Sequence, residues 1–152
     1  MDGSLMVEER YLEVKQYLGE GYRPCVDYGR WRVAILRHIL ELDISNIHFM
    51  ERHLETDEVF VLLDGRCILL IGEGEEEIEK IHAVDMASQK IYNVKKGVFH
   101  THTLSRDAVV LIVENKDTGL NNSERIPLLA DQRREILSLT RSLWKDELDS
   151  IP

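Results

Sequence analysis

The 152-residue sequence has few of the features that mark secreted, membrane-bound or nucleic-acid-binding proteins. It has only two cysteines, Cys25 and Cys67, which lie far apart and form no C-x-x-C pattern. Its first residues contain acids and no long apolar stretch of the kind that a signal peptide carries. No run approaches the ~20 apolar residues that a membrane span requires. We therefore expect a cytoplasmic protein whose cysteines are reduced and packed as small apolar side chains.

An excess of basic residues is also missing. The sequence has 19 Lys and Arg against 28 Asp and Glu, a net charge of −9. A protein that binds the phosphates of nucleic acid or an anionic membrane surface presents a basic face. The charge therefore argues against both partners and leaves a small-molecule ligand. The hydrophobic content of 43% is ordinary for a globular protein, and the length predicts one domain over residues 1–152 with its own core.

Short apolar runs rich in β-branched residues dominate the middle of the chain and predict strands. Amphipathic segments at the two ends predict helices at about 4–18 and 129–148. Residues 22–28 carry Pro24 and read as irregular, and the acidic stretch 72–80 reads as a solvated hairpin tip. The predicted strands are 31–42, 47–53, 59–63, 68–71, 81–86, 91–94, 98–104 and 108–113. Such evenly spaced strands favour an all-β barrel over about 22–115, with both helices packed outside it.

The stretch 51–65, E-R-H-L-E-T-D-E-V-F-V-L-L-D-G, combines a histidine, several acids and a strand. Asp64-Gly65 is a strong hairpin signal, because a type I′ turn needs positive φ at both central residues. The run 68–71 would then be the return strand. His53 and Glu58 lie just before and at the start of this strand. A histidine and a carboxylate so placed are typical ligands of a metal site.

A second stretch, 92–102, supplies further polar side chains. His100 and His102 are two residues apart, so on a strand both point to one face, and Tyr92 has the same parity. Gly97 indicates a turn just before them. If the inward faces of both stretches meet inside a barrel, their side chains converge. The other histidines, His38, His48 and His82, have the parity or the charged surroundings of outward-facing residues, and we leave all three out.

Together the two stretches resemble the cupin family. The first cupin motif is H-x-H, three or four residues, Glu, six residues and Gly; here His53, Glu58 and Gly65 fit its last three positions. The second motif is P-x-G-x-x-H followed by three residues and Asn, and here Gly97 and His100 fit. The segments G-V-F-H-T-H-T-L and V-V-L-I-V-E-N resemble most closely the small bacterial cupin metalloproteins linked to surface-polysaccharide synthesis.

Four positions depart from the cupin motifs. Glu51 stands at the first His position, Lys95 at the Pro position and Leu104 at the final Asn position, and Ser45 stands where the first motif opens with Gly. The resemblance covers roughly residues 31–115. The departure at Glu51 leaves two alternatives open: a carboxylate ligand in place of an imidazole, or a site that has lost its metal.

The resemblance implies a small jelly roll, a homodimer and a divalent ion, Fe, Mn, Ni or Zn, held by the residues at the matched positions. These metal ligands would be Glu51, His53, Glu58 and His100, and His102 and Tyr92 would be the catalytic candidates in the pocket. Four of these residues have a plainer alternative. Glu58 would be a buried acid hydrogen-bonded to His100, Glu51 would point to the barrel mouth, His102 would support the ligands, and Tyr92 would pack in the core.

Three functions follow from this interpretation. The first is a metal-dependent enzyme that acts on a small polar metabolite such as a sugar or a hydroxy-acid. The second is a non-catalytic protein that binds or senses a small molecule. The third is an interaction protein whose barrel is filled by side chains. A fold alone does not choose among them, because one fold hosts many chemistries.

Overall fold

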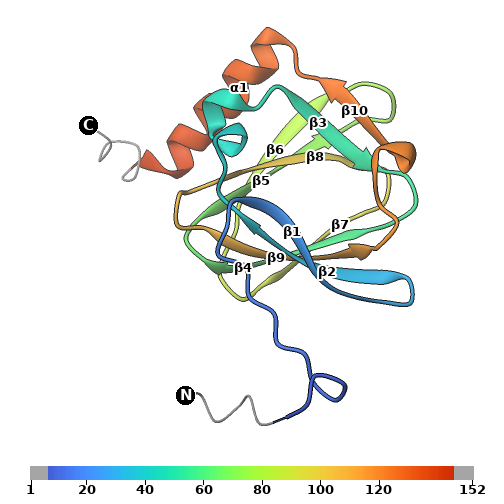
Figure 1. The fold of residues 1–152 in the computed structure, drawn as a ribbon. Coiled ribbons are helices and arrows are strands. Elements are labelled where there is room, and N and C mark those ends of the chain that lie inside the picture. The colour runs from blue at the N-terminus through green and yellow to red at the C-terminus, as the bar shows by residue number, and fades with distance from the viewer. Residues whose placement is uncertain (1–6, 146–152) are drawn as a thin grey trace.

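The computed structural model describes residues 7–145 and consists mainly of two facing antiparallel sheets of five strands each (Figure 1). In spatial order, the first sheet contains β1 (Gly21–Tyr28), β2 (Trp31–Arg37), β9 (Val109–Asn115), β4 (Glu58–Asp64) and β7 (Ile91–Val94). The second contains β10 (Ser123–Pro127), β3 (Phe49–His53), β8 (Phe99–Leu104), β5 (Cys67–Glu73) and β6 (Lys80–Asp85). Short 3-10 turns occupy η2 (Leu40–Leu42), η3 (Ile44–Asn46) and η4 (Leu120–Asn122). The predicted all-β fold is confirmed, but the two sheets do not close into a barrel.

Two apolar clusters hold the sheets in place. The first fills the space between the sheets, with Phe60, Leu69 and Ile112 among its members. Cys67 is fully buried in this cluster, and neither cysteine forms a disulfide. The second cluster lies outside the second sheet, where Ile68 and Leu70 point away from the first. Strand β5 is therefore buried on both faces, which explains its unbroken apolar sequence.

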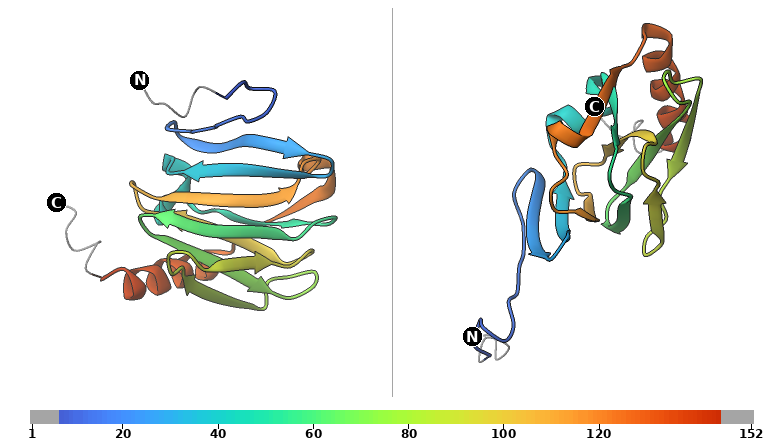
Figure 2. Two further views of the ribbon diagram at one scale, coloured as in Figure 1. Left: turned by 90° about the horizontal axis from the view of Figure 1, so that it is seen from below. Right: turned by 90° about the vertical axis from the view of Figure 1, so that its right-hand side faces the viewer.

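Helix α1 (Ala130–Leu143) covers the outer face of the second sheet (Figures 1 and 2). Its buried residues Ile136 and Thr140 face the sheet, and the Trp144 indole donates a hydrogen bond to Asp85 Oδ1 at 3.2 Å. The predicted C-terminal helix is thus confirmed, although it is shorter than 129–148; residues 146–148 lie outside the described range. No helix within residues 7–145 is long and apolar enough to cross a bilayer.

The predicted N-terminal helix is wrong. Residues 7–18 form no helix, and they run away from the sheets (Figures 1 and 2); residues 4–6 of that prediction lie outside the described range. The side chains of Tyr11, Val14 and Leu18 are about 70% exposed, at 71%, 69% and 71%. Periodicity alone does not stabilise so short a helix, because most helical stability in proteins comes from packing an apolar face.

The predicted hairpin at Asp64-Gly65 is also wrong. β4 belongs to the first sheet and β5 to the second, so this turn carries the chain from one sheet to the other. Gly65 has φ +69°, and a Cβ built on it would lie 2.6 Å from the backbone of Ala108. The glycine is therefore required by a close approach of two chain segments. The acidic stretch 72–80, in contrast, does join β5 and β6 as a hairpin.

Two strands lie outside the predicted ones. β1 (Gly21–Tyr28) includes the stretch read as irregular, and it tolerates Pro24 because it is an edge strand with an irregularity between Pro24 and Val26. β10 (Ser123–Pro127) is a polar strand that pairs with β3. Both strands border the end of the fold that holds the site described below.

Replacing Gly65 with alanine tests the close approach at the corner. Gly29 is the matched control, because its φ is +59° but a Cβ there would meet nothing within 4 Å. We expect Gly29→Ala to lower the free energy of unfolding by about 1 kcal/mol, from the left-handed backbone alone. Gly65→Ala should cost about 1–3 kcal/mol more, because the backbone must also shift. Urea titration measures both, and equal losses would contradict the steric explanation.

Candidate metal centre

Three buried side chains from three strands converge between the sheets. His53 ends β3, Glu58 begins β4 and His100 lies in β8; their exposed fractions are 7%, 6% and 4%. His53 Nε2 lies 2.7 Å from Glu58 Oε2, and His100 Nε2 lies 3.0 Å from the same oxygen. The carboxylate of the first sheet therefore meets both imidazoles of the second sheet.

The local sequence explains this convergence. In β4 the buried residues Glu58, Phe60 and Leu62 alternate with more exposed ones, so Glu58 has the parity of the core. The Gly97 N–H donates to the His53 carbonyl at 2.8 Å, which ties the turn before β8 to the end of β3. Gly97 has φ +80°, as a turn residue at that point requires. The second motif is thus fastened to the first by a backbone hydrogen bond.

The second nitrogen of each imidazole is also bound. His100 Nδ1 donates to the Val98 carbonyl at 2.9 Å, and His53 Nδ1 lies 2.8 Å from Ser123 Oγ. Ser123 lies directly opposite His53 in the β3–β10 pairing. Because these contacts fix the two rings through Nδ1, both Nε2 atoms point at Glu58. Contacts of this kind orient metal-binding histidines and set their tautomer.

Burial and hydrogen bonding act in opposite directions on this cluster. Burial alone would raise the pKa of Glu58, but hydrogen bonds from His100 and His53 outweigh it and hold that pKa well below its ordinary value. Burial likewise would lower the pKa of His53, but the hydrogen bond and charge of Glu58, with the charges of Glu114 and Glu51, raise it. The Glu58 carboxylate is thus stabilised in its charged form by the hydrogen bonds from the two Nε2 atoms.

The cluster also fits a divalent ion. Each of the three residues offers one ligand atom, and these atoms all lie within 4.8 Å of one another. Metal–ligand bonds of about 2.0–2.2 Å place neighbouring ligand atoms roughly 3 Å apart, close to the separations observed. Two imidazoles and one carboxylate leave coordination positions open, as in several first-row metal enzymes. The described residues therefore form a possible metal site of two His and one Glu.

Glu51, the fourth predicted ligand, lies beside this group and outside it. Its Oε2 accepts a hydrogen bond from Arg125 Nε at 2.9 Å, and its Oε1 lies 3.8 Å from His53 Nε2. Arg125 is its direct cross-strand neighbour in β10. Its side chain is 27% exposed. The structure thus places Glu51 at the rim of the site, where its guanidinium partner holds it.

The two predicted catalytic residues differ in position. Tyr92 does not reach the site: its hydroxyl accepts a hydrogen bond from the Ala87 N–H at 2.8 Å, and its ring lines a separate, largely apolar hollow. The structure thus places Tyr92 outside the cavity that His53 and Glu58 line. His102 lines the same cavity as His53, with its ring 5.7 Å from Phe60. Its Nδ1 is enclosed and has no hydrogen-bond partner among the described residues.

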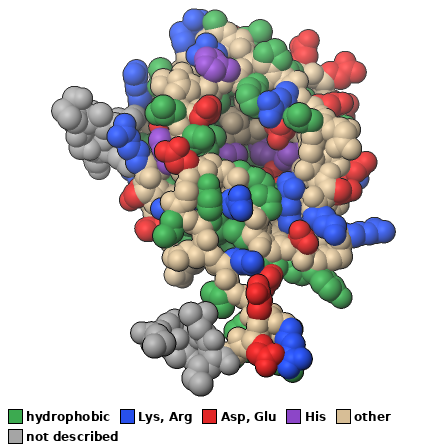
Figure 3. All heavy atoms as spheres, viewed as in Figure 1, with side chains coloured by type: hydrophobic (Ala, Val, Ile, Leu, Met, Phe, Trp, Pro, Cys, Tyr) green, Lys and Arg blue, Asp and Glu red, His purple; other side chains and the backbone are tan. Residues whose placement is uncertain are grey.

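A cavity of about 520 Å³ opens above the cluster. Figure 3 shows histidine side chains in the hollow between the two sheets. One part of its wall is apolar, including Leu36, Leu42 and Ile112, and the other is charged. The charged part carries four carboxylates but only two guanidinium groups; these residues are Glu41, Glu51, Glu58, Glu114, Arg32 and Arg125. The excess of negative charge would be balanced by a divalent cation.

Sequence reasoning missed Arg32, Glu114 and Tyr22 on this wall. Strand parity carries a signal for the first two, because Arg32 shares a face with the buried Ala34 and Leu36, and Glu114 with Val110 and Ile112. The two are direct neighbours in the β2–β9 pairing. Tyr22 was missed because its strand was read as irregular.

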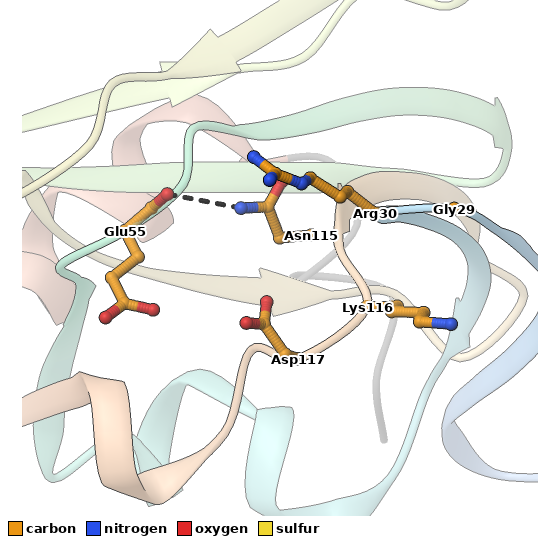
Figure 4. Close-up of a pocket in the computed structure, with 6 residues that line it drawn as sticks. All are labelled: Gly29, Arg30, Glu55, Asn115, Lys116 and Asp117. Atoms are coloured by element: carbon orange, nitrogen blue, oxygen red, sulfur yellow. Dashed lines mark hydrogen bonds between the residues drawn. The ribbon is translucent and has the colours of Figure 1, made fainter.

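A second hollow, of about 440 Å³, lies among loops at the edge of the first sheet (Figure 4). There the Asn115 side chain donates to the Glu55 carbonyl at 3.2 Å, across from Asp117 and Lys116. None of the predicted site residues lines it. Among the described residues, the His53–Glu58–His100 group therefore lies at the other cavity, between the sheets.

Comparison with known proteins identifies the fold. Neither a protein-family model nor a curated protein matches the sequence. Among solved structures, a variant of Streptomyces Pac13 with uridine matches with TM-score 0.53 and 7% identity, over 80% of this chain and 88% of that one. Pac13 is described as a nucleoside dehydratase. The capsular polysaccharide assembling protein CapF from Staphylococcus aureus matches with TM-score 0.50 and 14% identity, over 68% of this chain and 30% of that one.

These likenesses concern the fold alone, because the identities are low. A cupin-2 domain protein from Shewanella frigidimarina also matches, with TM-score 0.46 and 15% identity. The chain therefore shares the overall fold of Pac13 and of the matched part of CapF.

The enclosed imidazole of His102 makes stability depend on pH. Burial, together with the charge of His100, lowers the pKa of His102 to about 4, against about 6.5 in an unfolded chain. Below pH 6.5 the unfolded chain therefore binds a proton that the folded chain does not. We expect the free energy of unfolding of the metal-free protein to fall between about pH 6.5 and pH 4, by at most about 3 kcal/mol from this group.

The His102→Leu variant isolates this contribution, because the other histidines are unchanged. Denaturant titrations from pH 7 to pH 4, in the presence of a chelator, should show a smaller loss of stability on acidification in the variant. Curves that run parallel over this range would contradict a His102 that stays neutral in the folded chain.

Proposed function

We propose that this chain is a single-domain, divalent-metal-dependent cupin enzyme that acts on a small hydroxylated metabolite such as a sugar. The observation that carries the proposal is the convergence of His53, Glu58 and His100 beneath a cavity of about 520 Å³. A volume in this range is typical of small-molecule sites.

Each residue of the cluster has a defined part in the proposal. His53 and His100 would bind the ion through Nε2 and Glu58 through Oε2, while Ser123 and the Val98 carbonyl hold the rings in position. A bound divalent ion supplies Lewis acidity, which polarises an oxygen or lowers the pKa of bound water. His102 lines the same cavity and stays neutral near pH 7, so it would offer a ligand one hydrogen-bond donor or acceptor nitrogen.

The cavity wall supports a hydroxylated ligand. Its apolar part suits the carbon face of a sugar ring or a base, and its carboxylates are acceptors for hydroxyl groups. Among proteins of similar fold, Pac13 is seen with uridine and CapF assembles capsular polysaccharide. Sugars and nucleosides are therefore the first ligands to test.

A non-catalytic binding protein is the competing function. The observation that favours it is that Glu58 already accepts a hydrogen bond from each imidazole, which satisfies the buried carboxylate without a metal. Fe, Mn, Ni and Zn all suit the ligand set, and the choice among them is open to measurement.

Metal analysis separates the two functions. We expect the purified or reconstituted protein to hold about one divalent ion per chain, and His53→Ala and His100→Ala to lower metal affinity at least about ten-fold, because each removes one of three ligands. His82→Ala is the control, since His82 pairs with Glu73 at the surface. Elemental analysis and competition with a chelator measure both quantities. A folded protein that takes up none of the four metals would contradict the proposal of a metal-dependent enzyme. The non-catalytic binding protein would then remain.

The proposal also includes a homodimer. The outer face of the first sheet carries apolar side chains that no described segment covers, among them Leu111, Val61 and Ile91, the last 75% exposed. The corresponding face of the second sheet is covered by α1. Exposed apolar faces of this kind commonly form interfaces, and two-fold dimers are the commonest assembly.

Light scattering after size-exclusion chromatography tests the dimer. We expect the mass of two chains, and the mass of one chain for Leu111→Glu, because a charge in the middle of the face opposes its burial. Glu124→Lys, at an exposed position of β10, is the control and should remain dimeric. A monomeric wild-type protein would exclude this part of the proposal.

A further inference from the structure

The cavity wall opposite the histidines contains a carboxylate that the metal site does not use. Glu114 lies near the end of β9 and is 6% exposed. Its Oε1 accepts hydrogen bonds from Arg32 Nη2 at 2.6 Å and from the Tyr22 hydroxyl at 2.5 Å. The side chain is thus held from two neighbouring strands, β1 and β2, through a single oxygen.

The other oxygen of Glu114 is left free by this arrangement. Oε2 is buried and has no hydrogen-bond partner among the described residues. It lies 3.9 Å from His53 Nε2, on the side of the cavity that faces the metal cluster. A buried carboxylate oxygen without a donor costs free energy, so a position that keeps one beside a ligand cavity indicates a donor brought by the ligand.

We propose that Glu114 binds a hydroxyl group of the ligand next to the metal cluster, so that the cavity selects compounds with two adjacent hydroxyl groups. One hydroxyl would donate to Glu114 Oε2, and its neighbour would face His53, Glu58 and His100. Arg32 and Tyr22 are positioning residues, because they hold Oε1 and thereby direct Oε2. The inference rests on the proposed function and adds the substrate class, a vicinal diol.

The surroundings favour a hydroxyl over a charged donor. Arg32 already neutralises the charge of Glu114, and Arg125 does the same for Glu51. A bound divalent ion would neutralise much of the remaining negative charge. A neutral diol then needs no further counter-charge in the cavity, whereas an ammonium group would lie close to the metal cation and be repelled by it.

Two matched pairs of compounds test the proposal. Isothermal titration calorimetry compares uridine with 2′-deoxyuridine, and D-ribose with 2-deoxy-D-ribose, on the protein loaded with the divalent ion that it retains best. We expect the diol of at least one pair to bind about ten-fold more tightly, as one hydrogen bond to a charged group provides. A preference within the first pair indicates that the diol belongs to a nucleoside. A preference within the second pair indicates that it belongs to a free sugar.

The Glu114→Gln variant should lose most of this preference, with the affinity for the deoxy compound and the metal content unchanged. Tyr22→Phe, which keeps the carboxylate and removes one of its donors, should lose part of it. Glu41→Gln is the matched control, because Glu41 lines the same cavity, is exposed and loses the same charge. It should keep the full preference. Circular dichroism confirms that each variant is folded.

Several outcomes would overturn the inference. Equal binding within both pairs would exclude a diol site, and an equal loss for diol and deoxy compounds in Glu114→Gln would make Glu114 a general structural residue. A loss of metal in Glu114→Gln would make it a metal ligand. If Glu114→Gln does not fold, an unchanged preference in Tyr22→Phe decides against the proposal. A wild-type protein that binds no metal would contradict the proposed function itself. A wild-type protein that binds metal but shows no preference for the diol would contradict only this inference.

Discussion

One buried carboxylate connects the two sheets at the end of the fold where the cavity opens. Glu58 belongs to the first sheet, and its Oε2 accepts a hydrogen bond from two imidazoles of the second. A carboxylate with 6% exposure is tolerable only when charged donors compensate its lost hydration. The positions of His53 and His100 are therefore constrained by Glu58. Removing either imidazole leaves the buried carboxylate with one donor fewer.

The same constraint means that a proton and a metal ion would compete for one place. Both rings are fixed through Nδ1, by Ser123 and by the Val98 carbonyl, so each Nε2 points to Glu58 whatever lies between them. A proton on Nε2 and an ion bound to it are alternatives, and metal binding must release protons from the cluster. The hydrogen bonds that raise the pKa of His53 therefore also oppose metal binding, and they do so more strongly as the pH falls.

Much of this site could be predicted from the sequence, because it depends on short-range rules. Strand parity places Glu58 and His100 on inward faces, and the spacing from Gly97 to His100 follows from a turn before a strand. Tertiary structure decides the rest. A glycine with positive φ is needed both at a hairpin and at a corner between sheets. The Asp64-Gly65 pair therefore does not reveal whether the following strand pairs with β4 or belongs to the other sheet. Amphipathic periodicity at 7–18 likewise does not reveal whether any surface is available to pack against.

The role of Glu51 depends on a strand that the sequence did not predict. Ser123 and Arg125, both in β10, lie opposite His53 and Glu51 in the β3 pairing. Ser123 therefore contacts the imidazole and supports the cluster, whereas Arg125 binds the carboxylate and draws it toward the rim. An imidazole at position 51 would have no such attraction to a guanidinium group. Glu51 and the arginine opposite it thus form one pair at the rim, which leaves His53, Glu58 and His100 as a three-residue cluster.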